Sequence, residues 1–135
     1  MMRGLCAVLL IVLYALSIQD SGAQRSLEEE SIDKSAVVTV LVRYRLLPDR
    51  IEQAMQDITQ LTSTVAAEEP ECLGIEVLQD VDDPTLVTLV ERWTSREVYE
   101  GPHMQTEHLQ SFIARARDNF AGPPDISFWI TEHAQ

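Results

Sequence analysis

The chain has 135 residues, 22 of them acidic and 10 basic, which gives a formal net charge of −12 at neutral pH. This balance argues against nucleic acid and anionic membrane surfaces as partners, because both repel a negatively charged protein. The simplest interpretation of the negative charge is a solvated acidic surface. The length suits one domain with a modest core.

Residues 1–23 have the pattern of a secretory signal peptide. Arg3 gives a positive start, Leu5 to Ile18 is apolar, and Ser21-Gly22-Ala23 offers small residues for cleavage before Gln24. The alternative is a retained membrane anchor, but this apolar run is shorter than the about 20 residues of a spanning helix. We therefore expect an exported protein that is secreted, periplasmic or in an organelle lumen, with no membrane contact after cleavage.

Residues 24–35 read as a flexible acidic linker that contains the run Glu28-Glu29-Glu30. Cleavage would leave Cys72 as the only cysteine, which excludes an intramolecular disulfide and any cysteine-based metal site. Cys72 either pairs between subunits or is a buried, unreactive thiol at the start of a strand. Residues 36–135 are predicted to form the single folded domain.

The domain is predicted to begin with an alternating strand over 37–46. Even-numbered residues from Val38 to Leu46 form its apolar face. Pro48 can then begin a helix, because its missing N–H costs little in the first turn. Apolar residues at spacings of three and four give this helix one buried face, and it should end before Pro70.

Two further strands are expected over 72–79 and 85–93, joined as an antiparallel hairpin by an Asp-rich turn. Thr94 or Ser95 can cap the helical segment that follows. Gly101-Pro102 should separate a short turn from the main second helix.

The second helix carries an apolar face that extends to Phe120, and Gly122-Pro123-Pro124 should end it. Ile126, Phe128 and Ile130 alternate in a last strand. The resulting order, β-α-β-β-α-β, predicts an α+β, ferredoxin-like fold with an antiparallel sheet. Helices cover one face of such a sheet, so a homodimer that pairs two sheets face to face is our hypothesis for the other face.

The third strand and the segment after it carry a specific set of motifs. The turn Asp82-Asp83-Pro84 precedes a strand that ends in Glu91-Arg92-Trp93, and His103 follows ten residues after the Trp. These motifs resemble the antibiotic biosynthesis monooxygenase (ABM) domain family. The step Leu47-Pro48-Asp49 is similar to the Pro-Gly step of that family, with Asp49 in place of Gly. The resemblance covers about 37–129.

The resemblance implies a dimeric α/β barrel with a pocket between helices and sheet in each subunit. Family members oxidise polycyclic phenols or quinols with O2 and no metal or flavin, while related branches degrade haem or isomerise a small sugar derivative. Fold similarity does not choose among these. On this resemblance we expect a cofactor-independent monooxygenase acting on a phenolic or quinol-type small molecule. The alternative is a non-catalytic module that binds a small aromatic molecule or haem.

His103 is the main catalytic candidate, because an imidazole with a pKa of ~6.5 exchanges protons near neutral pH. A deprotonated phenol transfers an electron to O2 more easily, so a basic imidazole in a dry pocket would help. The alternative is that His103 only caps the second helix or bonds to a carbonyl. His108 would lie ~140° further round a continuous helix, so the two rings should face apart and share no metal ion. We expect His108 at the surface or lining the substrate pocket.

Strand residues complete the candidate site. Trp93 could stack on a flat ligand or pack in the core. Glu91 lies on the same face, where a carboxylate is costly unless paired, so a salt bridge is expected and a general-base role is the alternative. The strand partners available for that bridge are Arg43, Arg45 and Arg92. Tyr44 and Arg43 could also contact substrate, one from each face of the first strand.

Several residue types are missing where other chemistries would need them. The only Asn is Asn119, whereas the haem-degrading and anthrone-oxidising branches have an Asn near the position of Val42. The only Lys, Lys34, lies in the linker, which argues against Schiff-base chemistry. Neither G-x-G-x-x-G nor H-E-x-x-H occurs. We therefore expect no cofactor and no metal, with haem bound through His103 as the alternative.

Overall fold

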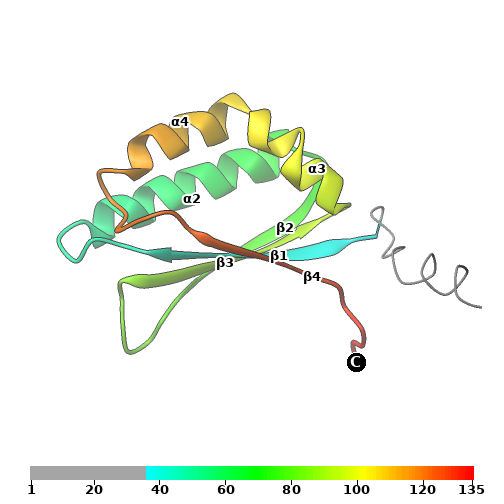
Figure 1. Ribbon diagram of the computed structural model, residues 1–135, viewed down its shortest axis with the longest axis horizontal. Coiled ribbons are helices and arrows are strands. Elements are labelled where there is room, and N and C mark those ends of the chain that lie inside the picture. Colours follow the sequence, from blue (N-terminus) through cyan, green and yellow to red (C-terminus); the bar gives the residue numbers. More distant parts are fainter. Residues whose placement is uncertain (1–35) are drawn as a thin grey trace, which may run out of the picture. The chain divides into compact units, whose positions relative to one another are not determined.

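The computed structural model describes residues 36–135 (Figure 1). The predicted signal peptide over 1–23 and linker over 24–35 lie outside the described residues. In the described part, strands and helices follow one another in the predicted order. The elements are β1 (Val38–Arg45), α2 (Ile51–Glu68), β2 (Cys72–Gln79), β3 (Leu86–Trp93), α3 (Arg96–Glu100), the 3-10 helix η1 (His103–Gln105), α4 (Glu107–Ala116) and β4 (Asp125–Trp129).

The four strands form one antiparallel sheet in the order β2-β3-β1-β4. The central pair, β1 and β3, aligns Val40 with Glu91, and β1 aligns Val40 with Phe128 of β4. The helices all lie on one face of the sheet (Figure 1). This arrangement confirms the predicted α+β, ferredoxin-like fold.

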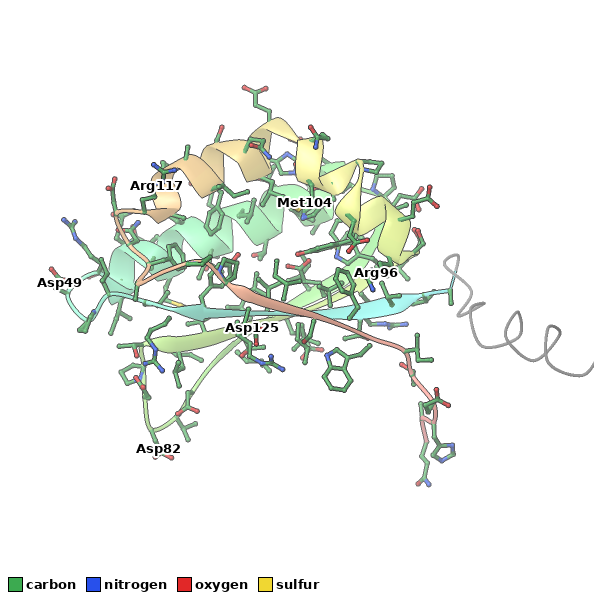
Figure 2. All side chains as sticks on the ribbon, viewed as in Figure 1. Asp49, Asp82, Arg96, Met104, Arg117 and Asp125 are labelled. Carbon is green, nitrogen blue, oxygen red and sulfur yellow. The ribbon has the colours of Figure 1, made fainter. Side chains whose placement is uncertain are left out.

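The core forms between that face of the sheet and α2 and α4. Alternate residues of β1 point into it, as predicted from the even-numbered apolar face, and Val40 is fully buried. The stripe of α2 that meets the sheet consists of Ala54, Ile58, Leu61 and Val65. At one end, the ring of Tyr44 contacts those of Phe112 and Phe120, with centroids 6.2 and 4.9 Å away. Side chains fill the layer between helices and sheet (Figure 2).

Two predicted helix boundaries were wrong by a few residues. The first helix begins at Ile51 rather than Pro48, because the Arg50 N–H bonds to the carbonyl of Leu47 and closes a turn first. The second ends at Ala116, before Phe120. Phe120 instead forms a β-bridge with Leu46, so its ring reaches the core from extended backbone.

The other face of the sheet has no helix over it (Figure 1). Leu78 on β2 and Trp129 on β4 lie on this outer face and are 49% and 54% exposed. Arg43 also points outward and pairs with Asp125 of the neighbouring strand at 2.7 Å. Among residues 36–135, no helix has the length and apolar character needed to cross a membrane.

Candidate functional site

His103 is placed by a break in the helical segment that follows β3. Ser95 caps α3 by accepting a hydrogen bond from the N–H of Val98 at 3.2 Å, so Ser95, and not Thr94, is the cap. The chain then turns at Gly101, where an added Cβ would lie 2.9 Å from the carbonyl oxygen of Glu97. This close approach explains why residue 101 is a glycine. The turn leads into η1, which directs His103 into the protein interior.

Glu69, next to the end of α2, binds both histidines. Nδ1 of His103 lies 3.0 and 2.9 Å from the two carboxylate oxygens of Glu69. Nε2 of His108 lies 2.5 Å from one of the same oxygens, and its Nδ1 is 3.5 Å from Glu68. A carboxylate accepts hydrogen bonds, so Nδ1 of a neutral His103 carries the hydrogen and Nε2 is the unprotonated nitrogen.

The prediction that the two histidine rings face apart was therefore wrong. It assumed one continuous helix, whereas His103 belongs to η1 and His108 to α4, with a break at Thr106 between them. The two rings meet at the carboxylate of Glu69. Within the part of the chain that the structure describes, no group of three or more His, Cys, Asp or Glu side chains could hold a metal.

Two aromatic rings, those of Trp93 and Tyr99, pack against the ring of His103. The centroid of Trp93 lies 4.4 Å from that of His103 and 5.7 Å from that of Tyr99, and Tyr99 lies 5.1 Å from His103. Trp93 is fully buried and His103 is 4% exposed. The rings of Trp93 and His103 thus pack directly on each other, and no third ring fits between them.

Glu91 lies beside Trp93 and is buried. Its carboxylate accepts a hydrogen bond of 2.9 Å from the indole Nε1–H of Trp93. Burial raises the pKa of Glu91 from its usual 4.5 to about 7, the indole hydrogen bond opposes this shift, and the charge of Glu69 adds to it. Glu91 is therefore a buried acid whose protonation changes near neutral pH.

The expected salt bridge between Glu91 and a strand arginine is not formed. Arg43 pairs with Asp125 and Arg45 with Asp83, at 2.7 and 3.4 Å. Both arginines alternate to the outer face of the sheet, opposite to the face that carries Glu91. The structure thus separates Arg43 from the other candidate residues.

Tyr44 points to the helix-covered face and is buried. Burial, together with the charge of Glu91, raises its pKa. Tyr99, which the sequence analysis did not single out, is also buried, and the same two causes raise its pKa. The side chains of Glu91, Trp93, His103 and Tyr99 form one buried polar and aromatic cluster, here called the Glu91–His103 cluster.

Opposing effects act on the pKa of His103. Burial is the largest and lowers the pKa from its usual 6.5, whereas the hydrogen bond and charge of Glu69 raise it, and His108 lowers it further. The net direction is downward. His103 is consequently neutral at neutral pH, the form in which an imidazole accepts a proton.

The sequence analysis missed Glu69, although one signal pointed to it. Glu68 and Glu69 lie at the C-terminal end of α2, where the helix dipole disfavours negative charge. A nearby hydrogen-bond donor stabilises an acidic residue at that position, and the two histidines supply such donors. Such a partner comes from a distant part of the sequence, so the position alone could not identify it.

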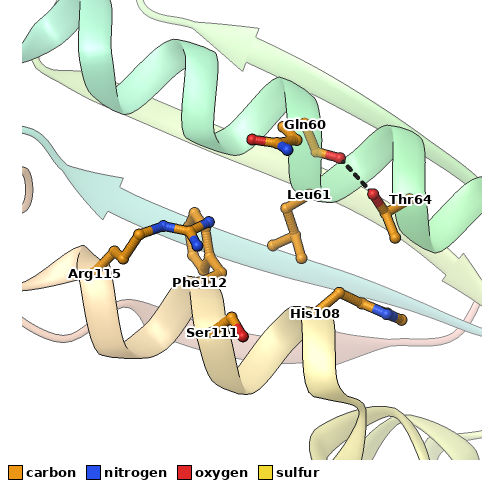
Figure 3. A pocket seen from close by; sticks show the side chains of 7 residues that line it. All are labelled: Gln60, Leu61, Thr64, His108, Ser111, Phe112 and Arg115. Carbon is orange, nitrogen blue, oxygen red and sulfur yellow. Dashed lines mark hydrogen bonds between the residues drawn. The ribbon is translucent and has the colours of Figure 1, made fainter.

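A pocket of about 160 Å³ lies between α2 and α4, next to His108 (Figure 3). From α2 it is lined by Gln60, Leu61 and Thr64. From α4 it is lined by His108, Ser111, Phe112 and Arg115. His108 thus lines this pocket, while Trp93 and His103 do not contribute to it.

Comparisons with known proteins point to one family. The sequence profile of the antibiotic biosynthesis monooxygenase (ABM) family matches residues 37–115. A proposed antibiotic biosynthesis monooxygenase from Caulobacter crescentus has 18% identity and a TM-score of 0.70, covering 78% of this chain and 99% of its own. Another from Nitrosomonas europaea has 20% identity and a TM-score of 0.66, covering 73% and 93%.

At these identities the solved structures show a shared fold. Comparison with curated proteins gives no match. The profile match extends from just before β1 almost to the end of α4, which is more than half of the chain and includes the whole Glu91–His103 cluster. The chain belongs to the antibiotic biosynthesis monooxygenase family.

Proposed function

We propose that the protein is a cofactor-independent monooxygenase that oxidises a phenolic or quinol-type small molecule with O2. The observation that carries this proposal is the contact between Nδ1 of His103 and the carboxylate of Glu69 at 2.9 Å. A carboxylate that holds one imidazole nitrogen fixes the tautomer and directs the other nitrogen to a substrate. Membership of the monooxygenase family supports the same reading.

In this proposal His103 acts as the base. Nε2 accepts the phenolic proton, and the phenolate then transfers an electron to O2 more easily than the phenol does. One oxygen atom becomes a carbonyl on a ring carbon, the other leaves as water with the hydrogen of that carbon and the phenolic hydrogen, and the substrate supplies all four electrons. The neutral state that burial favours for His103 suits this role.

Neighbouring side chains have supporting roles. Glu91, with a pKa near 7, can hold or release a proton inside the cluster. Trp93 and His108 would border the bound aromatic molecule. Tyr44 adds a buried phenol on the same side of the sheet. Arg43 lies on the outer face, so any contact that it makes with a ligand occurs there.

A second candidate function is a non-catalytic module that binds small molecules. Direct packing of Trp93 on His103, with centroids 4.4 Å apart, favours it, because a substrate reaches His103 only after side chains move. Haem bound through His103 is the variant of this function that includes a cofactor. Haem, too, would reach His103 only after side chains move.

Oxygen consumption with a panel of hydroquinones tests the enzymatic proposal. The natural protein should consume O2, and His103→Gln should be slower by ~100-fold or more, as expected for loss of a general base. His133→Ala is the control, because His133 is exposed near the C-terminus. Equal rates for the natural protein and His103→Gln would exclude His103 as base. Binding of a hydroquinone without O2 consumption would favour the module, and a Soret shift with added haem that disappears in His103→Gln would favour haem.

We also propose that the protein is exported and forms a homodimer through the outer face of its sheet. The exposed apolar side chains of Leu78 and Trp129 support the dimer, because an uncovered sheet face of this kind gains from a partner. N-terminal sequencing of the mature protein tests export. A start near Gln24 would support it, and retention of Met1 would contradict it.

A further inference from the structure

The pocket between α2 and α4 has a polar edge and an apolar base. Leu61 and Phe112 are buried and form the base. Gln60 on α2 and Ser111 and Arg115 on α4 are exposed at the edge (Figure 3). Ser111 and Arg115 are four positions apart on α4, so they share one helix face. The cavity therefore offers hydrogen-bond donors above an apolar surface.

The donors at this edge are not engaged elsewhere. Among residues 36–135, arginine side chains form ion pairs at Arg43, Arg45 and Arg96, and Arg115 is not one of them. Ser111 has no hydrogen bond through its hydroxyl within the same range. Thr64, by contrast, donates its hydroxyl to the carbonyl oxygen of Gln60 at 3.0 Å (Figure 3). A guanidinium at the edge of a pocket, with no ion pair among these residues, can attract an anion.

The charges along the pocket give a ligand one orientation. His108 is held by Glu68 and Glu69 at one end, where an anion would be repelled. Arg115 lies seven residues further along α4, a rise of ~10 Å, at the other end. These charges therefore favour an anionic group near Arg115 and Ser111, with the apolar surface of Leu61 and Phe112 beside it.

We propose that this pocket binds a small carboxylate with an apolar body. A volume of about 160 Å³ is below the ~300–1,000 Å³ of pockets for drug-sized molecules, so the ligand is small. Carboxylate fits the guanidinium because two parallel N–H groups match its two oxygens. This site lies outside the Glu91–His103 cluster and does not depend on oxygenase activity.

Benzoate, followed by NMR shifts of backbone amides, tests the proposal. Benzoate should give saturable shifts around Ser111 and Arg115, and Arg115→Gln should weaken binding by ~10-fold or more, as expected for loss of a charge-assisted hydrogen bond. Arg117→Gln is the matched control. Arg117 lies just beyond α4 (Figure 2), is exposed and is not among the residues that line the pocket. This variant should therefore bind benzoate within ~2-fold of the natural protein.

Three results would overturn the proposal. One is shifts that grow linearly with benzoate and do not saturate. Another is equal weakening by Arg115→Gln and Arg117→Gln, which would indicate attraction to the overall charge of α4. The third is binding of the neutral analogue benzyl alcohol as tight as that of benzoate, which would remove the role of the carboxylate.

Discussion

The indole of Trp93 donates a hydrogen bond of 2.9 Å to Glu91, two residues earlier on the same face of β3. Both side chains are buried, so the bond compensates a carboxylate that has no arginine partner among residues 36–135. The compensation is incomplete, because burial still raises the pKa of Glu91 to about 7. Glu91 and Trp93 at the end of β3 are thus a single hydrogen-bonded unit.

Glu91→Gln should stabilise the protein above neutral pH. The pKa of Glu91 is about 7 in the folded protein and 4.5 when unperturbed, so the folded state binds the proton more tightly. The free energy of unfolding therefore falls as pH rises from about 4.5 through 7, by up to about 3 kcal/mol. Gln stays neutral and still accepts from the indole, so it should remove this loss.

Urea unfolding of Glu91→Gln and the natural protein at pH 5 and pH 8 measures the effect. The two should differ little at pH 5, and the variant should be more stable at pH 8. The lowered pKa of His103 makes the free energy of unfolding rise with pH below about 6.5. Both proteins contain His103, so this contribution cancels when their stabilities are subtracted at each pH. Glu132→Gln, at an exposed position beyond β4, should show no such dependence. Equal differences at both pH values would contradict the assignment.

Trp93→Phe should destabilise the protein more at pH 8 than at pH 5. Phe removes the N–H donor to Glu91 and leaves a small cavity in a fully buried position, with a combined cost of about 2–4 kcal/mol. The cavity cost is independent of pH, but the lost hydrogen bond matters most for the ionised carboxylate. Chemical unfolding at the two pH values separates these parts. A cost that does not change with pH would mean that the hydrogen bond contributes little.

Glu69→Gln should lower the pKa of His103 further. Glu69 raises this pKa through its hydrogen bond and its charge, against the larger effect of burial. NMR titration of the imidazole resonances measures the change directly. Glu68→Gln is a close control, because Glu68 contacts His108 and not His103. A higher His103 pKa in Glu69→Gln, or an equal change in both variants, would show that Glu69 does not position this imidazole.

A charge on the outer face of the sheet should prevent the proposed dimer. Leu78→Glu and Trp129→Glu each place a carboxylate on that face, where a partner sheet would bury it at high cost. Light scattering after size-exclusion chromatography should give a dimer for the natural protein and a monomer for both variants. Val81→Glu is the control, because Val81 is 96% exposed in the turn between β2 and β3. A monomeric natural protein would contradict the proposal.

Local patterns predicted most of the fold. Alternation placed the even-numbered residues of β1 in the core, and spacings of three and four identified the buried face of α2. The Asp-rich turn between the second and third strands gave their antiparallel pairing. The helix ends were less accurate, because a turn at 47–50 and the bridge from Phe120 to Leu46 depend on neighbours that periodicity does not reveal.

Sequence alone determined the order of elements, the inward face of each strand and the family motif around Glu91, Trp93 and His103. Only the tertiary structure decided what these side chains contact. Glu69 meets His103 from 34 residues away, and the arginines expected beside Glu91 point to the opposite face. Periodicity and turns act within a few residues along the chain, whereas the partner of a buried charge is set by how separate elements pack together.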